Sequence, residues 1–165
     1  MSFLFSYDLT NLKDEDINAL YPIKMQKLSS THWTPVDIAK KAIRFLAEDG
    51  RKVILDLGSG SGKFCLVAAA CSDAIIVGVE QRENLVQLSR KVAKSLSLHN
   101  LKFIHADLVE IDFEDYDSFY FFNAFEEFIN PKDKMDKTQE LDEFSYKAYI
   151  QLIHQKFDQA LKGLE

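Results

Sequence analysis

The segment that most constrains the fold is a glycine-rich loop, Asp56-Leu-Gly-Ser-Gly-Ser-Gly62. It directly follows Val53-Ile54-Leu55, a continuous apolar run that is typical of a strand buried on both faces. Glycine allows a tight turn and a close approach of a ligand to the backbone, and a helix after the loop offers unpaired N–H groups. Open α/β sheets bind nucleotides at such a loop, at the carboxyl end of the first strand.

The apolar pattern alternates between strand and helix along the rest of the chain. It predicts a helix between Thr34 and Gly50, with Thr34 as N-cap, Pro35 as first helical residue, and one apolar stripe made of Ile38, Ala42, Ile43, Phe45 and Leu46. The other predicted elements are strands Val53–Leu57, Ala74–Val79, Leu101–His105 and Ser118–Phe122, and helices Lys63–Cys71, Glu83–Leu98 and one ending near Leu161. The alternation predicts an α/β fold, a Rossmann-like doubly wound and mostly parallel sheet with helices on both faces.

Length and composition favour a cytoplasmic protein with one core. We expect residues 1–31 to be a lead-in that packs on a core of residues 32–165. No apolar run approaches the ~18 residues of a membrane span, and no basic segment precedes the short apolar patch at the start. The net charge of −6 does not favour a nucleic-acid partner. Cys65 and Cys71 would lie on different helix faces, and the four histidines lack ligand spacing, so no metal is expected.

The spacing of the glycines separates three classes of ligand. A phosphate loop of the ATPase kind requires glycine at Leu57 and Ser or Thr at Phe64, which excludes that class. The dinucleotide fingerprint requires glycine or alanine at Lys63, which weakens that class. What remains is an acidic residue two positions before the first glycine, followed by Gly-x-Gly-x-Gly, so a dinucleotide and an adenosyl ligand both stay open at this point.

Acidic residues stand at the ends of three successive predicted strands. Glu80 can accept hydrogen bonds from both hydroxyls of a ribose. Asp107 can accept from the exocyclic amine of adenine, while the N–H of Leu108 donates to a ring nitrogen. A strand-end aspartate alone is more often a turn former or helix cap. Asp56, Glu80 and Asp107 beside one glycine loop together indicate an adenosyl ligand.

With these motifs, residues 52–128 resemble the core of class I S-adenosylmethionine-dependent methyltransferases. Ala68-Ala-Ala, Gly78-Val-Glu80 and Asn123-Ala-Phe125 are similar to the non-SET histone-lysine methyltransferases and small bacterial relatives, although only one asparagine of their Asn-Asn-Phe-Ala-Phe ending is present. The resemblance implies a methyltransferase with S-adenosyl-L-methionine as cofactor. The predicted cofactor-binding residues are Thr34, Asp56, Gly58, Ser59, Gly60, Gly62, Glu80, Gln81, Asp107 and Leu108.

The acceptor side is less defined by the sequence. Asn123 is the predicted catalytic residue, either orienting an acceptor amine through its side-chain carbonyl or capping the strand end. Phe125 either walls the methyl site or is an ordinary core aromatic, and Trp33-Thr34 either closes over the methionine end or serves only as a helix cap. The acceptor itself is not identified by the sequence, and the resemblance suggests a protein lysine or a small-molecule nitrogen. Two alternatives stay open: a non-catalytic S-adenosylmethionine-binding scaffold and a dinucleotide-dependent oxidoreductase.

The number of predicted strands is smaller than the resemblance implies. The family sheet has the order 3-2-1-4-5-7-6, whereas only four strands are predicted here. We therefore expect a C-terminally truncated core with an incomplete acceptor half. The open fourth strand, with Phe119–Phe122, is expected to favour a homodimer through the sheet edge, unless a helix or the amino-terminal segment covers it.

Overall fold

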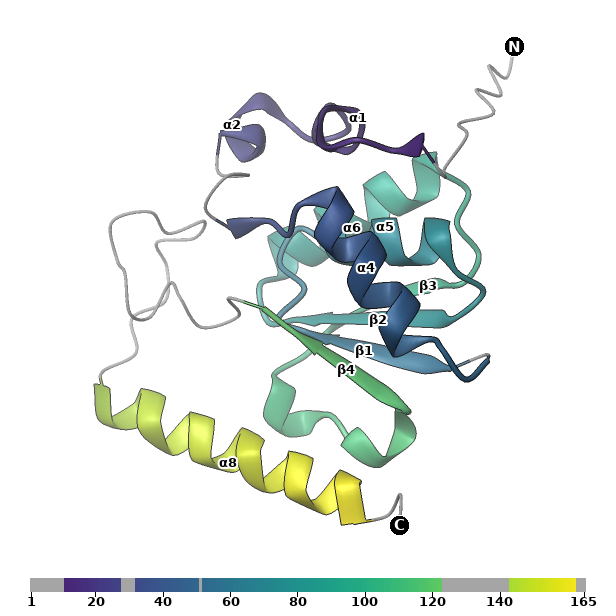
Figure 1. The fold of residues 1–165 in the computed structure, drawn as a ribbon. Coiled ribbons are helices and arrows are strands. Elements are labelled where there is room, and N and C mark those ends of the chain that lie inside the picture. The colour runs from purple at the N-terminus through teal and green to yellow at the C-terminus, as the bar shows by residue number, and fades with distance from the viewer. Residues whose placement is uncertain (1–10, 28–31, 51, 123–142, 163–165) are drawn as a thin grey trace.

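The computed structural model describes residues 11–27, 32–50, 52–122 and 143–162 and consists of a sheet between two helical layers (Figure 1). In chain order the elements are α1 (Asp14–Asn18), α2 (Ile23–Gln26), α4 (Val36–Leu46), β1 (Val53–Leu57), α5 (Lys63–Cys71), β2 (Ile75–Glu80), α6 (Glu83–Ser95), β3 (Leu101–His105), the 3-10 helices η2 (Leu108–Glu110) and η3 (Phe113–Asp115), β4 (Ser118–Phe121) and α8 (Glu143–Lys162).

The sheet has the strand order β3-β2-β1-β4, and all three pairs of neighbours are parallel. This confirms the predicted α/β class and its Rossmann-like sheet. The order reverses between β1 and β4, so the loop after β1 stands at the point where open α/β sheets bind ligands. Within the described residues the sheet has four strands, and the fifth to seventh strands of the family sheet are not among them.

Alternate residues of the strands face two separate cores. Ile54 and Ile76 pack in a core with α4, α5 and α6, whereas Leu55 and Val77 pack in a second core with η2, η3 and α8. Figure 1 shows these layers above and below the sheet. β1 and β2 are thus buried on both faces, as the continuous apolar run of β1 predicts, whereas β3 and β4 are only partly buried.

The start of α4 differs from the prediction. Pro35 is the N-cap and Val36 the first helical residue, so Thr34 is not the cap. The carboxylate of Asp14 in α1 instead accepts a hydrogen bond from the Val36 N–H, at 3.2 and 3.3 Å to its two oxygens. A residue distant in sequence therefore satisfies one of the unpaired donors of this helix.

The predicted apolar stripe of α4 is wrong for two of its five residues, whereas Ala42, Ile43 and Leu46 pack on the core. Ile38 and Phe45 are 47% and 76% exposed, while Val36, Ala39 and Ile43 are buried. Positions 38 and 45 are seven residues apart and share one side, about 140–160° around the helix from Ile43. The helix therefore carries apolar residues on two sides, and only one of them packs on the core.

Other boundaries shift by one to three residues, among them the end of β2, which lies at Glu80 rather than Val79. Ala74 lies before β2, and its carbonyl accepts a hydrogen bond from the Asn100 side-chain amide at 2.9 Å. Helix α6 ends at Ser95 rather than at Leu98, and Ser97 adopts a left-handed conformation with φ 53°. Phe122 follows β4 rather than ending it.

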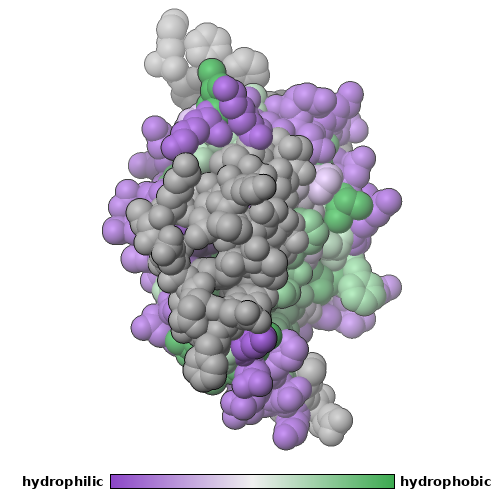
Figure 2. Space-filling model, turned by 90° about the vertical axis from the view of Figure 1, so that its left-hand side faces the viewer, coloured by the Kyte–Doolittle hydropathy of each residue, from purple (hydrophilic) through white to green (hydrophobic). Residues whose placement is uncertain are grey.

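Apolar side chains are exposed at the β4 edge of the sheet, among the residues that the structure describes. Phe121 and Phe122 are exposed beside β4, whereas Phe119 contacts Phe157 of α8, with the ring centroids 5.1 Å apart. In Figure 2 the hydrophobic surface gathers along one side of the face shown, next to residues whose placement is uncertain. Pairing of two copies through this edge stays a prediction.

The described part of the amino-terminal segment packs on the core. Leu12, Ile17 and Tyr21 are buried in the same cluster as Ile54. The boundary expected between residues 31 and 32 stays a prediction, as does the truncated acceptor half.

Candidate cofactor site

The glycine loop joins the end of β1 to the start of α5 through two glycines with different surroundings. Gly60 and Gly62 have φ of 54° and 82°, in the left-handed region that favours glycine. A Cβ added at Gly62 would lie 2.6 Å from the Phe103 ring and 2.9 Å from the Ser89 hydroxyl. Gly62 therefore faces the packed core, whereas Gly60 lines a pocket above the loop.

This pocket joins the loop to the segment before α4 and to the end of β4. Five of the ten predicted cofactor-binding residues line it, and the other five do not. Its lining residues are His32, Trp33, Thr34, Asp56, Gly58, Ser59, Gly60, Ser61, Lys63, Phe64, Arg82, Tyr120 and Phe122.

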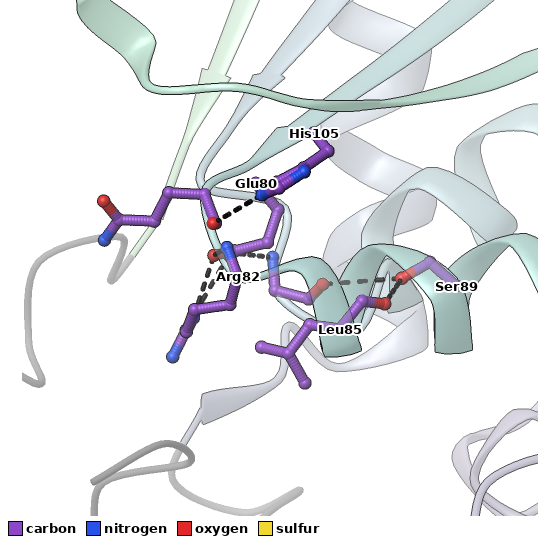
Figure 3. A network of polar contacts seen from close by, with 7 residues as sticks. Glu80, Arg82, Leu85, Ser89 and His105 are labelled. Carbon is purple, nitrogen blue, oxygen red and sulfur yellow. Dashed lines mark hydrogen bonds and ion pairs between the residues drawn. The ribbon is translucent and has the colours of Figure 1, made fainter. Parts of the chain in front are cut away.

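Glu80 is the centre of a polar network beside the pocket (Figure 3). Its side chain is 3% exposed and accepts hydrogen bonds from the backbone N–H groups of Gly60 and Arg82, both at 2.9 Å. The Arg82 guanidinium donates two more, at 2.8 and 3.1 Å. Four donors thus occupy a carboxylate with about four acceptor positions. Ribose hydroxyls can bind there only if the guanidinium moves.

The remaining predicted residues lie at the ends of β2 and β3. Asp107 caps η2 by accepting from the Val109 N–H at 3.1 Å, and the Tyr149 hydroxyl of α8 donates to the same oxygen at 2.7 Å. Leu108 is buried in the second core. The backbone carbonyl of Gln81 contacts Nε2 of His105 at 3.0 Å. Asp107 therefore has the structural role of a helix cap. Both of its hydrogen bonds above are accepted by Oδ1, and Oδ2 takes part in neither.

Asp56 is a buried carboxylate in the pocket wall. Cys65 of α5 donates its thiol hydrogen to Asp56 Oδ2 at 3.0 Å. Burial raises the pKa of Asp56 to about 7, the thiol hydrogen bond opposes this shift, and the charge of Glu80 adds to it. Burial also raises the pKa of the Cys65 thiol well above its usual value. The pair is therefore poised to hold a proton near neutral pH.

The raised pKa of Asp56 predicts a change of stability with pH. Between about pH 4 and pH 7 the folded protein keeps a proton on Asp56 that the unfolded chain releases, so this group's stabilisation is lost as pH rises through that window. We expect Asp56→Asn, which cannot titrate, to flatten the pH dependence of unfolding free energy by up to about 1 kcal/mol per pH unit. Denaturant unfolding of both proteins at pH 5, 6, 7 and 8 measures the difference; parallel curves would contradict the prediction.

Contacts over long sequence separations hold the amino-terminal segment against the loop. The Tyr21 hydroxyl donates to the Ser61 carbonyl at 2.8 Å, and Lys63 pairs with Asp14. Farther along, the Thr34 hydroxyl is 2.8 Å from the Tyr120 hydroxyl on β4. Thr34 therefore reaches the predicted site through a tertiary contact rather than as a helix cap.

Several lining residues were not predicted from the sequence. Ser61 and Lys63 belong to the loop or follow it directly, and Arg82 is two residues after Glu80, so motif spacing could have indicated them. Tyr120 stacks on Phe64 with ring centroids 3.5 Å apart, a contact that no local sequence pattern predicts. No signal in the sequence singles out His32.

Residues 48–162 match a family described as methyltransferase domain. The chain belongs to the methyltransferase domain family. The match covers more than half of the chain and includes the glycine loop, Glu80 and Asp107, which confirms the predicted resemblance. S-adenosylmethionine is the cofactor that this resemblance implies. The family favours a methyltransferase over a dinucleotide-dependent oxidoreductase.

Relatives of this methyltransferase domain are similar over part of their length. A tRNA (guanine-N(7)-)-methyltransferase of Prochlorococcus marinus is 37% identical over 82 residues, 49% of this chain and 38% of the relative. The 23S rRNA (uracil(1939)-C(5))-methyltransferase RlmD of Marinomonas posidonica is 32% identical over 108 residues, 63% of this chain and 22% of the relative. The chain thus spans less than half the length of these curated relatives.

Solved structures are also similar to this methyltransferase domain. An RNA methyltransferase from Salinibacter ruber in complex with S-adenosyl-L-homocysteine is 30% identical, covers 53% of this chain and 58% of its own, and has a TM-score of 0.46. An S-adenosylmethionine-dependent O-methyltransferase from Thermotoga maritima is 22% identical, covers 59% and 38%, and has a TM-score of 0.48.

Other predictions for the methyltransferase domain concern residues that the structure does not describe. Asn123 and Phe125 lie outside the described residues, so their roles stay predictions.

Among the described residues, no group of three or more His, Cys, Asp or Glu side chains is arranged to hold a metal ion. None of the helices described is both long and apolar enough to cross a membrane. The cytoplasmic location stays a prediction.

Proposed function

We propose that this chain is an S-adenosylmethionine-dependent methyltransferase domain that binds its cofactor along the loop between β1 and α5. One observation carries the proposal: the glycine loop of a methyltransferase family match borders a pocket at the carboxyl edge of the sheet, with buried Asp56 in its wall and Glu80 bonded to Gly60. Ligands of open α/β sheets bind in this position.

The sheet order suggests how the cofactor would lie. In our proposal Asp107, after β3, accepts from the adenine amine, and Glu80, at the end of β2, accepts from the ribose hydroxyls. The sulfur and amino acid end would then extend over β1 towards Thr34 and Tyr120 at β4. The fit is supported by Asp56, a buried acid whose ionised form would attract the cofactor's ammonium group.

The chain's contribution to the reaction is positioning and exclusion of water. S-adenosylmethionine supplies an electrophilic methyl group when bound, and its transfer is an in-line displacement. The acceptor must be held about 3 Å from the methyl carbon, and water must be excluded. Aromatic walls of the pocket exclude water in our proposal; they are the stacked rings of Phe64 and Tyr120 and the buried ring of Trp33. A dedicated general base is not required.

We propose RNA as the class of acceptor. The two curated relatives above are named for methylation of a guanine N7 in tRNA and of a uracil C5 in 23S rRNA. The sequence resemblance suggested a protein lysine or a small-molecule nitrogen, and the net charge of −6 does not favour nucleic acid. That charge, however, opposes only sequence-independent binding to phosphates. A folded RNA can instead be recognised by its shape and its unpaired bases.

Calorimetric titration tests the cofactor assignment. We expect S-adenosylhomocysteine to bind with one site per chain and NAD not to bind, because Lys63 stands where the dinucleotide fingerprint needs glycine or alanine. Binding of NAD in preference to S-adenosylhomocysteine would overturn the proposal.

A methyl-transfer screen with tritiated S-adenosylmethionine tests the acceptor. Total tRNA, ribosomal RNA and a lysine-rich protein are offered to the same preparation, and we expect label in RNA. Label in protein alone would refute the RNA assignment and support the lysine acceptor. S-adenosylhomocysteine binding without label in any acceptor would favour the non-catalytic scaffold.

A further inference from the structure

Unpaired polar atoms are concentrated in the lining of the pocket. Among the described residues, four buried side-chain atoms lack a hydrogen-bond partner: Asn18 Oδ1, Trp33 Nε1, Ser59 Oγ and Ser61 Oγ. Three of the four belong to residues that line the pocket. Buried polar groups in native proteins are nearly always paired, because an unpaired one costs its full desolvation free energy. Their concentration here indicates a ligand group that pairs with them.

Trp33 lies away from the region assigned to ribose and adenine, while Ser59 stands between the two regions, with its backbone N–H donating to the Val79 carbonyl of β2 at 2.8 Å. Glu80 ends β2 and Asp107 follows β3, on one side of β1, whereas Thr34 is bonded to Tyr120 of β4, on the other. Trp33 precedes Thr34 directly and is 6% exposed. A ligand lying along the loop would therefore meet Trp33 at the end opposite its base.

The chemistry of this end suits an anion. The indole N–H of Trp33 can only donate a hydrogen bond, and the hydroxyls of Ser59 and Ser61 can each donate one. The Lys63 ammonium lies 5.5 Å from the centre of the Trp33 ring, although its direct partner is Asp14. Three neutral donors with a cation nearby match a carboxylate, which only accepts.

We propose that Trp33 Nε1, together with the hydroxyls of Ser59 and Ser61, binds the carboxylate at the amino acid end of the cofactor. Trp33 is then a positioning and specificity residue: it selects ligands that carry this carboxylate and fixes the methionine end of the molecule. The proposal rests on the proposed function, since it assigns one further group of the same ligand.

The surroundings of Trp33 hold its ring in place. Tyr21 packs against it with ring centroids 4.6 Å apart, and the Tyr21 hydroxyl donates to the Ser61 carbonyl at 2.8 Å. Tyr21 is buried and does not line the pocket. Tyr21→Phe therefore removes a buried hydrogen bond next to Trp33 without removing a donor from the pocket, which makes it a matched control.

The test compares two ligands that differ only in the carboxylate, S-adenosylmethionine and its decarboxylated form. Calorimetry on Trp33→Phe is expected to show a loss of affinity for S-adenosylmethionine of roughly tenfold or more, as for a hydrogen bond to a charged group. Affinity for the decarboxylated ligand should stay within about twofold, because that ligand never used the indole N–H. Tyr21→Phe should change both affinities by the same factor.

Each outcome decides between the two proposals. If Trp33→Phe weakens both ligands equally or neither, Trp33 does not bind the carboxylate, while the proposed function stands. If the unmodified chain binds neither ligand nor S-adenosylhomocysteine, the proposed function itself fails. Should Trp33→Phe not fold, Ser61→Ala gives the same comparison, since it removes a smaller donor and keeps the aromatic contacts; equal effects on both ligands would again overturn the proposal.

Discussion

Replacing Glu80 with alanine is expected to weaken binding of S-adenosylhomocysteine by about 1.5–3 kcal/mol, or roughly 10- to 150-fold in Kd. The carboxylate is buried and is the proposed acceptor for both ribose hydroxyls. It also accepts from the N–H groups of Gly60 and Arg82, so its loss leaves two backbone donors and a guanidinium without this partner. Calorimetry measures Kd, and circular dichroism establishes that the variant is folded.

Arg82→Gln separates the two roles of this network. It removes the guanidinium that occupies Glu80 and keeps the carboxylate and both backbone contacts. Because ribose no longer has to displace two charge-assisted bonds, we expect S-adenosylhomocysteine to bind at least as tightly as to the unmodified chain. Unchanged affinity in a folded Glu80→Ala protein would show that ribose lies elsewhere.

Replacing Gly60 with valine is expected to abolish binding of the same ligand, with a loss of more than about 100-fold in affinity through steric exclusion. Gly60 lines the pocket and has φ of 54°, a conformation that a β-branched residue rarely adopts. The strain is expected to cost about 1–2 kcal/mol of stability and to leave the sheet folded. Calorimetry and thermal unfolding together measure both effects.

Gly62→Val is the matched comparison because Gly62 is in the same loop and also has a positive φ. Its added atoms would meet the Phe103 ring and Ser89 in the core, so we expect overpacking of about 1–3 kcal/mol in addition to backbone strain. Gly60→Val should thus affect binding more than stability, and Gly62→Val stability more than binding. If Gly60→Val binds normally, the loop is structural and the ligand lies elsewhere.

The order of the elements and the place of the loop follow from local patterns in the sequence. Continuous apolar runs such as Val53–Leu55 predict strands buried on both faces, and the bounds of β1, α5 and β3 agree with prediction. Acidic residues at three strand ends and the spacing of the glycines selected the ligand class and the family. These features depend only on residues close together in the sequence. The periodicity of apolar residues and the spacing within motifs are therefore enough to find them.

Tertiary packing, in contrast, sets which of these residues share a pocket and what each one contacts. Tyr21 and Ser61 are 40 residues apart, and Thr34 and Tyr120 are 86 apart, yet both pairs are in hydrogen-bond contact. No local pattern encodes such pairings, because they follow from how helices and strands pack once the sheet has formed. The same packing turns Gly62 to the core and Gly60 to the pocket, buries Asp56, and leaves the indole N–H of Trp33 without a partner beside the loop.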